Sequence, residues 1–170
     1  MHGDDDEGFR EFVVVHRGAL LRTAYLLTGD HGHAEGLVQT ALLKTCRHWR
    51  RVAGRGDPSA YVRRVLITTA TSWRRRLLTT EQVMDVVPER AHHDRHAERS
   101  DEVMEALRAL PPRMRAVVVL RYYEDRSEAQ TAELLGCSVG TVKTQSSRAM
   151  ARLGLALADS AAAPRAGERS

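Results

Sequence analysis

The fold is decided by SEAQTAELLGCSVGTVKTQSSRAMAR, the stretch at residues 127–152. Ser127, followed three residues later by Gln130, forms a capping-box pattern typical of a helix start. Gly136 stands where a helix commonly ends, and Ser138 is a suitable N-cap for a second helix. The stretch therefore predicts two helices joined by a tight turn. The first of them should bury four apolar residues: Ala129, Ala132, Leu134 and Leu135.

The second helix of this pair has an inward and an outward face. Its inward residues recur at helical spacing and are Val142, Ser146, Ala149 and Leu153. The outward side chains are hydroxyls, an amide and two cations: Thr141, Lys143, Thr144, Gln145, Ser147 and Arg148. A solvated face usually includes Glu or Asp, but no acid occurs from residue 138 to residue 158. Because such groups suit the major groove of DNA, we expect this face to bind DNA, together with Ser127.

The composition of the chain predicts an all-α protein. Ala, Leu, Arg and Glu dominate, and alternating β-branched residues are nearly absent. No apolar run approaches membrane-spanning length, and the acidic start MHGDDDEG does not resemble a signal peptide. We therefore expect a cytoplasmic protein with no membrane association. Cys46 and Cys137 lie far apart without a CxxC partner, which predicts reduced thiols.

Charge alternates along the chain in four blocks. Residues 1–40 have a net charge of −4, residues 41–78 of +9, residues 79–112 of −4 and residues 113–170 of +3. Two basic blocks separated by an acidic connector suggest two contacts on one polyanion. Arginine outnumbers lysine by 24 to 2, which favours bidentate contacts with phosphates and bases, although GC-rich coding would give the same bias.

Helical periodicity divides the chain into two domains. The first, at residues 8–78, should contain helices at 8–27 and 34–51 and a third that begins at Pro58, capped by Asp57.

Between the two domains the periodicity fades. Residues 79–99, with Pro88 and three histidines, predict a flexible linker. The second domain, at residues 100–155, should add a short helix and a helix at 113–123 before the helix-turn-helix. Residues 156–170 are expected to form a disordered tail.

Four stretches of the chain resemble the extracytoplasmic-function (ECF) sigma factors of bacterial RNA polymerase. They are YLLTGDHGHAEGLVQTALLKTCRHW (25–49), DPSAYVRRVLITTATSWRRR (57–76), ALPPRMRAVVVLRYYEDRSEAQTAELLG (109–136) and CSVGTVKTQSSRAMARL (137–153). The last two are the more specific. The combination of YLLTGD with YVRRVL is similar to the actinobacterial subgroup often called the SigE family.

This resemblance implies that the two domains have different roles. It also implies that the chain has no catalytic site and binds no metal or cofactor. The first domain, sigma region 2, would bind core polymerase and melt the −10 element, and the second, sigma region 4, would read the −35 element. Contacts with the clamp helices of the largest polymerase subunit would come from Leu37, Val38, Gln39, Leu42 and Leu43. Contacts with the −10 element would come from Tyr61, Arg63, Arg64, Thr68, Ser72, Trp73, Arg74, Arg75 and Arg76. Further expected partners are the polymerase flap and an anti-sigma factor.

Several residues that could bind DNA or a metal ion also have a purely structural explanation. Trp49 lies on an apolar stripe, which favours core packing over stacking on an unpaired base. The arginine run at residues 74–76 either holds the DNA backbone or is a solvated helix end favoured by the helix dipole. His92 and His96 have a spacing that would suit zinc on a helix, but the linker context favours solvated side chains.

The chain also departs from the family pattern at five positions. Relatives usually carry acids where Gly36 and Thr40 stand, so these residues remove expected polymerase contacts. Thr68 replaces a frequent Asn, and Ser72 replaces an acid or Asn. Arg126 replaces an apolar residue before the Ser127 cap, at the cost of a hydrophobic staple.

Two other classes of function remain open on the sequence. A stand-alone dimeric helix-turn-helix regulator would use the same TVK-containing helix, but it would need neither the basic first domain nor the helix at 34–51. An enzyme is poorly supported, since neither GxSxG nor GxxxxGK[ST] occurs.

Overall fold

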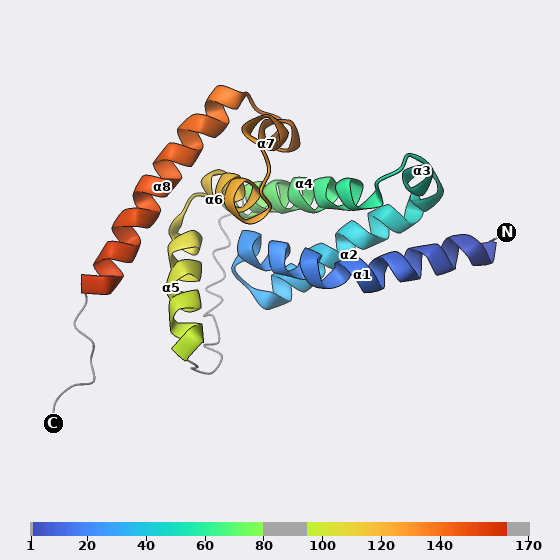
Figure 1. Cartoon of the computed structure of the whole chain (residues 1–170), viewed down its shortest axis with the longest axis horizontal. Coiled ribbons are helices and arrows are strands. Elements are labelled where there is room, and N and C mark those ends of the chain that lie inside the picture. Colours follow the sequence, from blue (N-terminus) through green and yellow to red (C-terminus); the bar gives the residue numbers. More distant parts are fainter. Residues whose placement is uncertain (1, 80–94, 163–170) are drawn as a thin grey trace.

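The structure, a computed structural model, describes residues 2–79 and 95–162, with side chains over residues 3–72 and 101–159. Within these ranges the chain forms helices and no strands. The helices of the first half are α1 (His2–Thr28), α2 (His31–Arg47), α3 (Trp49–Gly54) and α4 (Pro58–Thr79). Those of the second half are α5 (Arg95–Ala109), α6 (Pro112–Val118), the π-helical turn η1 (Val119–Tyr123), α7 (Glu128–Leu135) and α8 (Val139–Ala162). The all-α prediction is therefore confirmed (Figure 1).

In the first half, the helix expected at 34–51 begins three residues earlier, at His31, and is interrupted at His48. That residue leaves the helical region (φ −115°, ψ 16°), and its N–H bonds to the Thr45 carbonyl, so that α2 ends and the short α3 begins. The break turns the chain so that Trp49 packs against the rings of Phe9 and Phe12. Helix α1 begins six residues earlier than expected, at His2 instead of Gly8.

In the second half, three expected boundaries differ. Helix α5 already begins at Arg95, inside the predicted linker; residues 80–94, including His92, lie outside the described residues. The helix expected at 113–123 begins at Pro112 and becomes π-helical at η1, where the Glu124 N–H bonds to the Val119 carbonyl five residues back. Helix α8 continues through Ala162 because residues 155–162 are rich in the strong helix formers Ala and Leu.

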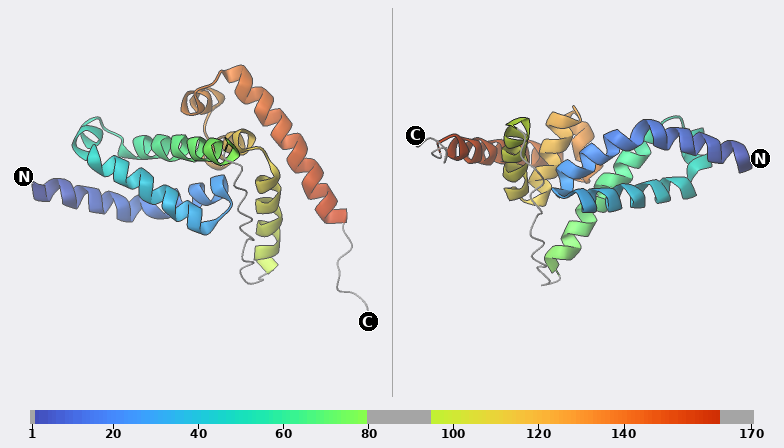
Figure 2. Two further views of the ribbon diagram at one scale, coloured as in Figure 1. Left: turned by 180° about the vertical axis from the view of Figure 1, so that it is seen from behind. Right: turned by 90° about the horizontal axis from the view of Figure 1, so that it is seen from below.

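The two halves are packed together rather than separate. Helices α5 to α8 lie at one end of the bundle formed by α1, α2 and α4, as two further views show (Figure 2). Helix α1 contacts α5, α6 and η1, and α4 contacts α6 and α7.

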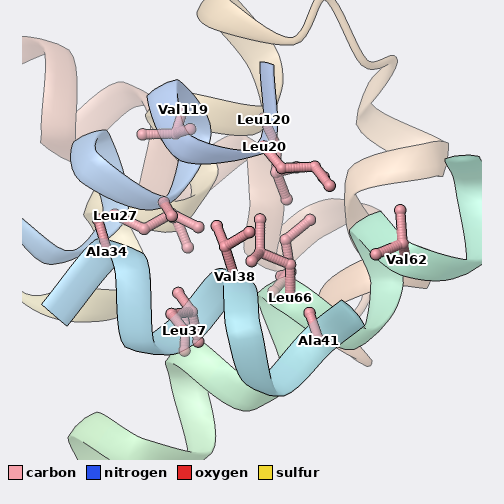
Figure 3. Close-up of a cluster of buried hydrophobic side chains, with 14 of the residues drawn as sticks. Leu20, Leu27, Ala34, Leu37, Val38, Ala41, Val62, Leu66, Val119 and Leu120 are labelled. Atoms are coloured by element: carbon pink, nitrogen blue, oxygen red, sulfur yellow. The ribbon is translucent and has the colours of Figure 1, made fainter. Parts of the chain in front are cut away.

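The main hydrophobic core draws on both halves. In Figure 3, Val119 and Leu120 of η1 reach Leu20 of α1, Val38 of α2 and Leu66 of α4, and all five are buried. Because apolar burial contributes about 25 cal/mol per Å², this shared core stabilises the packing of the two halves against each other.

Two arginines of the second half bind carbonyls at the C-terminal end of α1. The Arg115 guanidinium, 2% exposed, donates to the carbonyls of Leu27 (3.1 Å), Leu107, Arg108 and Leu110. Arg108 Nε donates to the Gly29 carbonyl (2.9 Å). Gly29 has φ 73°, and a Cβ there would lie 2.8 Å from Arg108 Cγ, so this close approach requires glycine.

Candidate nucleic-acid and polymerase interfaces

The helix-turn-helix has the cap geometry that the sequence predicted. Ser127 Oγ accepts from the Gln130 N–H, and Gln130 Oε1 accepts from the Ser127 N–H, each at 3.0 Å. Gly136 adopts the left-handed conformation (φ 65°) that ends α7. Ser138 Oγ then accepts from the Thr141 N–H (3.1 Å) and caps α8.

The core-facing sides of these two helices are largely as predicted. Val142 and Ala149 are fully buried, and the Ser146 hydroxyl lies 3.2 Å from that of Tyr122. One prediction for α7 is wrong, because Ala129 is exposed. Thr131 is fully buried instead, since the short helix is rotated to pack beside α8.

The outward face of α8 is accessible in the described chain. Lys143, Thr144, Ser147 and Arg148 are exposed, while Thr141 and Gln145 are partly exposed. Lys143 Nζ lies 3.8 Å from Glu128 Oε2, within the same domain. Because both side chains of that pair are substantially solvated, it is weak and leaves Lys143 free to exchange Glu128 for a phosphate. The geometry is that of a helix able to enter a DNA groove.

Helix α4 starts at the predicted cap, Asp57. Its Oδ1 accepts from the N–H groups of Ser59 (3.1 Å) and Ala60 (3.3 Å) and from the Ser59 hydroxyl. The bond from the Ser59 hydroxyl and then the backbone bond from Ala60 hold the pKa of Asp57 below its usual value of 3.8. Pro58 occupies the first helical position, as expected.

The residues expected to contact the −10 element lie along α4 in different environments. Thr68 and Ser72 are exposed and Tyr61 is partly exposed. The side chains of Trp73, Arg74, Arg75 and Arg76 lie outside the described ones.

The two remaining arginines of α4 face the second domain. Arg63 Nε lies 3.4 Å from Glu124 Oε2, and Arg64 Nη2 donates to Glu133 Oε1 at 2.8 Å.

Glu124 was missed by sequence reasoning. Its side chain is 8% exposed, and its second oxygen accepts from the Thr23 hydroxyl of α1. No local pattern marks it, because both its partners lie in the other domain. Arg115 could have been found: it shares a helical face with Val118 and Val119, so it had to be buried.

Two of the five residues predicted to contact polymerase on α2 are buried in this structure. Leu37 (7% exposed) and Val38 (1%) belong to the core, since they sit on the apolar stripe that packs against α1 and α4. Gln39 and Leu43 are exposed, and Leu42 is half-buried against the core. The accessible part of the predicted surface is therefore Gln39, Leu43 and the edge of Leu42.

The structure also bears on the other features considered in the sequence: Trp49, the two cysteines, a metal site and a membrane span. Trp49 packs against the core, which supports the structural explanation. Both cysteines are free. Among the described residues there is no cluster of three His, Cys, Asp or Glu suited to a metal ion, and His96 lies in α5 without a described side chain. Over the same part of the chain, no helix is long and apolar enough to cross a membrane.

Comparison with known proteins identifies both halves. Residues 12–78 match Sigma-70 region 2, and residues 100–153 match Sigma-70 region 4. The chain is 40% identical over 154 residues to the RNA polymerase sigma-E factor of Streptomyces avermitilis, covering 89% of this chain and 86% of that protein. It is 31% identical to the ECF RNA polymerase sigma factor SigL of Mycobacterium tuberculosis, covering 87% of this chain and 88% of the relative.

Two solved structures have a similar fold. The sigma factor RpoE of Bartonella quintana, in complex with the anti-sigma factor NepR, superposes with a TM-score of 0.69 at 24% identity, covering 89% of this chain and 97% of that one. CnrH, in complex with the cytosolic domain of CnrY, gives a TM-score of 0.62 at 20% identity over 91% and 90% of the two chains.

These matches define a two-domain transcription initiation factor. The chain belongs to the ECF sigma factors of the sigma-70 family and resembles the sigma-E proteins of Streptomyces. It is an alternative sigma factor, which directs RNA polymerase to specific promoters. The resemblance inferred from the sequence is confirmed.

Proposed function

We propose that the promoter is read at two places on this chain. The −35 element binds the outward face of α8, where exposed cations, hydroxyls and an amide occur without an acid from residue 138 to residue 158. That acid-free face is the observation that carries the proposal, because acids would repel the phosphates that flank a groove. Six side chains of α8 and the cap of α7 contribute: Ser127, Thr141, Lys143, Thr144, Gln145, Ser147 and Arg148.

The −10 element binds α4. Arginines supply phosphate contacts, and Tyr61 and Trp73 supply surfaces for stacking on unpaired bases, which is worth about 1–3 kcal/mol per base. This surface comprises Tyr61, Arg63, Arg64, Thr68, Ser72, Trp73, Arg74, Arg75 and Arg76. Core polymerase binds the accessible edge of α2, where Leu43 exposes 63% of its surface beside Gln39. Gln39 and Leu43 lie one helical turn apart on this edge, and the half-buried Leu42 adds a further apolar contact beside them.

Domain roles follow from these surfaces. Residues 8–78 act as the core-binding and −10 domain and residues 100–155 as the −35 domain, joined by a linker at 79–99. The chain works in the cytoplasm beside the polymerase and carries out no catalysis itself. An anti-sigma factor controls it, by analogy with the complexes of RpoE with NepR and of CnrH with the cytosolic domain of CnrY.

Run-off transcription tests the proposal. Core polymerase with the purified chain, on fragmented genomic DNA of the source organism, should initiate at a small set of sites that share −35 and −10 sequences. Gel filtration with core polymerase supplies the second readout, in which the two should co-elute. Dimeric DNA binding with no co-elution would overturn the proposal in favour of a stand-alone regulator.

A further inference from the structure

We propose that this chain binds a small phosphorylated molecule, of the size of a nucleotide, in a cavity between α4 and α7. The cavity has a volume of about 340 Å³, and its polar lining consists of Tyr61, Arg63, Arg64, Arg126, Gln130 and Glu133. This volume is at the lower end of the range of about 300–1,000 Å³ that is usual for ligand pockets. None of the promoter and polymerase contacts proposed above needs a ligand here, so the inference goes beyond them.

The lining of this cavity carries more positive than negative charge. Three arginines and a single glutamate line it, which leaves a formal excess of two positive charges. A phosphate monoester carries a charge of about −1.5 to −2 at pH 7 and matches this excess, whereas a carboxylate would neutralise only half of it. A guanidinium also binds phosphate through two parallel N–H bonds. Charge and donor geometry therefore favour a phosphate group over a carboxylate as the anion.

Arg126 is the cation of the lining that pairs with no acid. Its backbone is fixed on both sides, because its N–H donates to the Leu120 carbonyl (2.8 Å) and its carbonyl accepts from Arg121 Nη1. Its guanidinium takes part in no ion pair within the described part of the chain. An apolar residue is expected here from the family pattern, since it would form a hydrophobic staple. A cation that replaces this apolar contact, on a fixed backbone beside a cavity, is suited to bind an anion from solution.

The two arginines of α4 can bind the same anion. Arg64 Nη2 donates to Glu133 Oε1 at 2.8 Å, but the two side chains are 53% and 72% exposed. A pair so well solvated is weak, so a phosphate can replace the carboxylate at Arg64. Arg63 pairs with Glu124, with 3.4 Å between Nε and Oε2. Because each guanidinium has five N–H donors, an arginine that keeps its acid partner can still donate to a ligand.

The rest of the lining suits the remainder of a nucleotide. Tyr61 supplies an aromatic ring, and Ala60 and Leu134 supply apolar surface. A planar base can stack on such a ring beside the arginines. Gln130 Oε1 already accepts from the Ser127 N–H (3.0 Å), so the amide of Gln130 has its N–H groups to offer to a ligand. The cavity therefore combines a phosphate-binding part with a surface for a planar ring.

A ligand at this place would contact both halves of the chain, since Arg64 belongs to α4 and Arg126 precedes α7. A molecule that binds the folded chain and not the unfolded one raises the melting temperature in proportion to the logarithm of its concentration. A DNA duplex cannot enter a cavity of this volume, so the proposed ligand is a small molecule and not the promoter.

Isothermal titration calorimetry of the full chain with ATP, pyrophosphate and adenosine, at about 0.15 M salt, tests the inference. ATP should bind one to one and raise the melting temperature, whereas adenosine, which has no phosphate, should not bind. Pyrophosphate should bind about tenfold more weakly than ATP because it has no ring to stack on Tyr61. Tyr61→Leu should reduce the affinity for ATP to that for pyrophosphate.

Three substitutions locate the site. Arg126→Leu should weaken ATP binding about tenfold, and the variant should fold because leucine is compatible with the family pattern before the Ser127 cap. Glu133→Gln removes the acid that competes for Arg64 and should strengthen binding about threefold. Arg152→Leu is the matched control. It removes an exposed arginine of α8 that does not line the cavity, so it should leave ATP affinity unchanged.

Four outcomes overturn the inference: no binding of ATP, equal affinity for adenosine and ATP, equal losses in Arg126→Leu and Arg152→Leu, or binding of a DNA strand of about 20 nucleotides by a chain that binds none of the small molecules. These measurements use neither polymerase nor a promoter. If run-off transcription succeeds while ATP does not bind, the ligand site is refuted and the proposed promoter function stands.

Discussion

Helices α4 and α8 each begin at a side-chain N-cap and each carry cations on an outward face, but those cations meet different neighbours. On α8, Arg148 is exposed, and Lys143 lies near Glu128 of its own domain. On α4, Arg63 and Arg64 pair with acids of the other domain. Two helix faces that appear equally suited to DNA in the sequence therefore differ in the structure: the cations of α8 are accessible, whereas Arg63 and Arg64 of α4 are paired with acids of the other domain.

This difference bears on the two promoter contacts proposed above. The face of α8 that we propose to bind the −35 element is accessible, whereas two arginines of the α4 surface that we propose to bind the −10 element pair with acids of the second domain. Substitutions in and around the two helices test this contrast, and they are given in order of decreasing expected effect.

Arg115→Met should have the largest effect, because Arg115 attaches the second domain to α1. Its loss leaves the buried Leu27, Leu107 and Leu110 carbonyls without this donor. Since a buried unsatisfied group costs about 1–3 kcal/mol, we expect a loss of about 3 kcal/mol in the free energy of unfolding, measured by guanidinium denaturation. Arg113→Met, at an exposed position two residues earlier, should change stability little. Equal losses in both variants would contradict this role.

Arg148→Ala should weaken binding to a cognate −35 duplex about tenfold, in line with the 1–3 kcal/mol of a good base contact. The free chain should show the effect without polymerase, because the outward face of α8 is already exposed. Fluorescence anisotropy with the duplex measures it. Arg152→Ala removes another exposed arginine, one turn later, and should have a much smaller effect. Unchanged binding and −35 dependence in Arg148→Ala would refute the assignment.

The caps of the two helices can be compared directly. Asp57→Ala and Ser138→Ala should each cost about 1 kcal/mol of stability at neutral pH, because each removes a side-chain acceptor for helix-start N–H groups. They should differ in pH dependence. The folded pKa of Asp57 lies below 3.8, so its contribution is complete above its unfolded pKa and is lost as the pH falls through the folded one.

Thermal unfolding from about pH 6 down to about pH 2 checks this difference. The deficit of Asp57→Ala relative to wild type should shrink toward the acid end, whereas that of Ser138→Ala should persist, since a serine hydroxyl does not titrate in this range. Parallel deficits in the two variants would show that Asp57 acts by its shape and not its charge.

Gly36→Ala should give the smallest effect, a gain of about 0.5–1 kcal/mol, because glycine within a helix is unfavourable. Gly36 is exposed on α2, and nothing lies within 4 Å of an added Cβ. Gly36→Glu restores the acid expected from the family pattern, so it should also raise affinity for core polymerase. Gly154→Ala, with equally open space on α8, should raise stability alone. A co-elution assay with core polymerase separates the charge effect from the helix effect.

Local patterns allowed much of the fold and site to be predicted. The Ser127 capping box, the left-handed Gly136 and the Asp57 cap depend on neighbours within a few residues, so sequence spacing was sufficient. The assignment of Leu37 and Val38 as polymerase contacts came from the family resemblance and not from a local pattern; both residues lie on the apolar stripe of α2 and are buried. Periodicity gives the face of a helix, but only packing decides which edge of it stays exposed.

The sequence by itself determined the helices, their caps, the acid-free face of α8 and membership of the ECF sigma factors. Tertiary structure decided the break at His48, the burial of Arg115 and the partners of Arg63 and Arg64. The physical reason is the distance along the sequence over which each feature is specified. A cap or an amphipathic face is specified within a few residues, whereas the pairing of Arg63 with Glu124 joins residues of different domains. It exists only because a shared core brings η1 against α1 and α4.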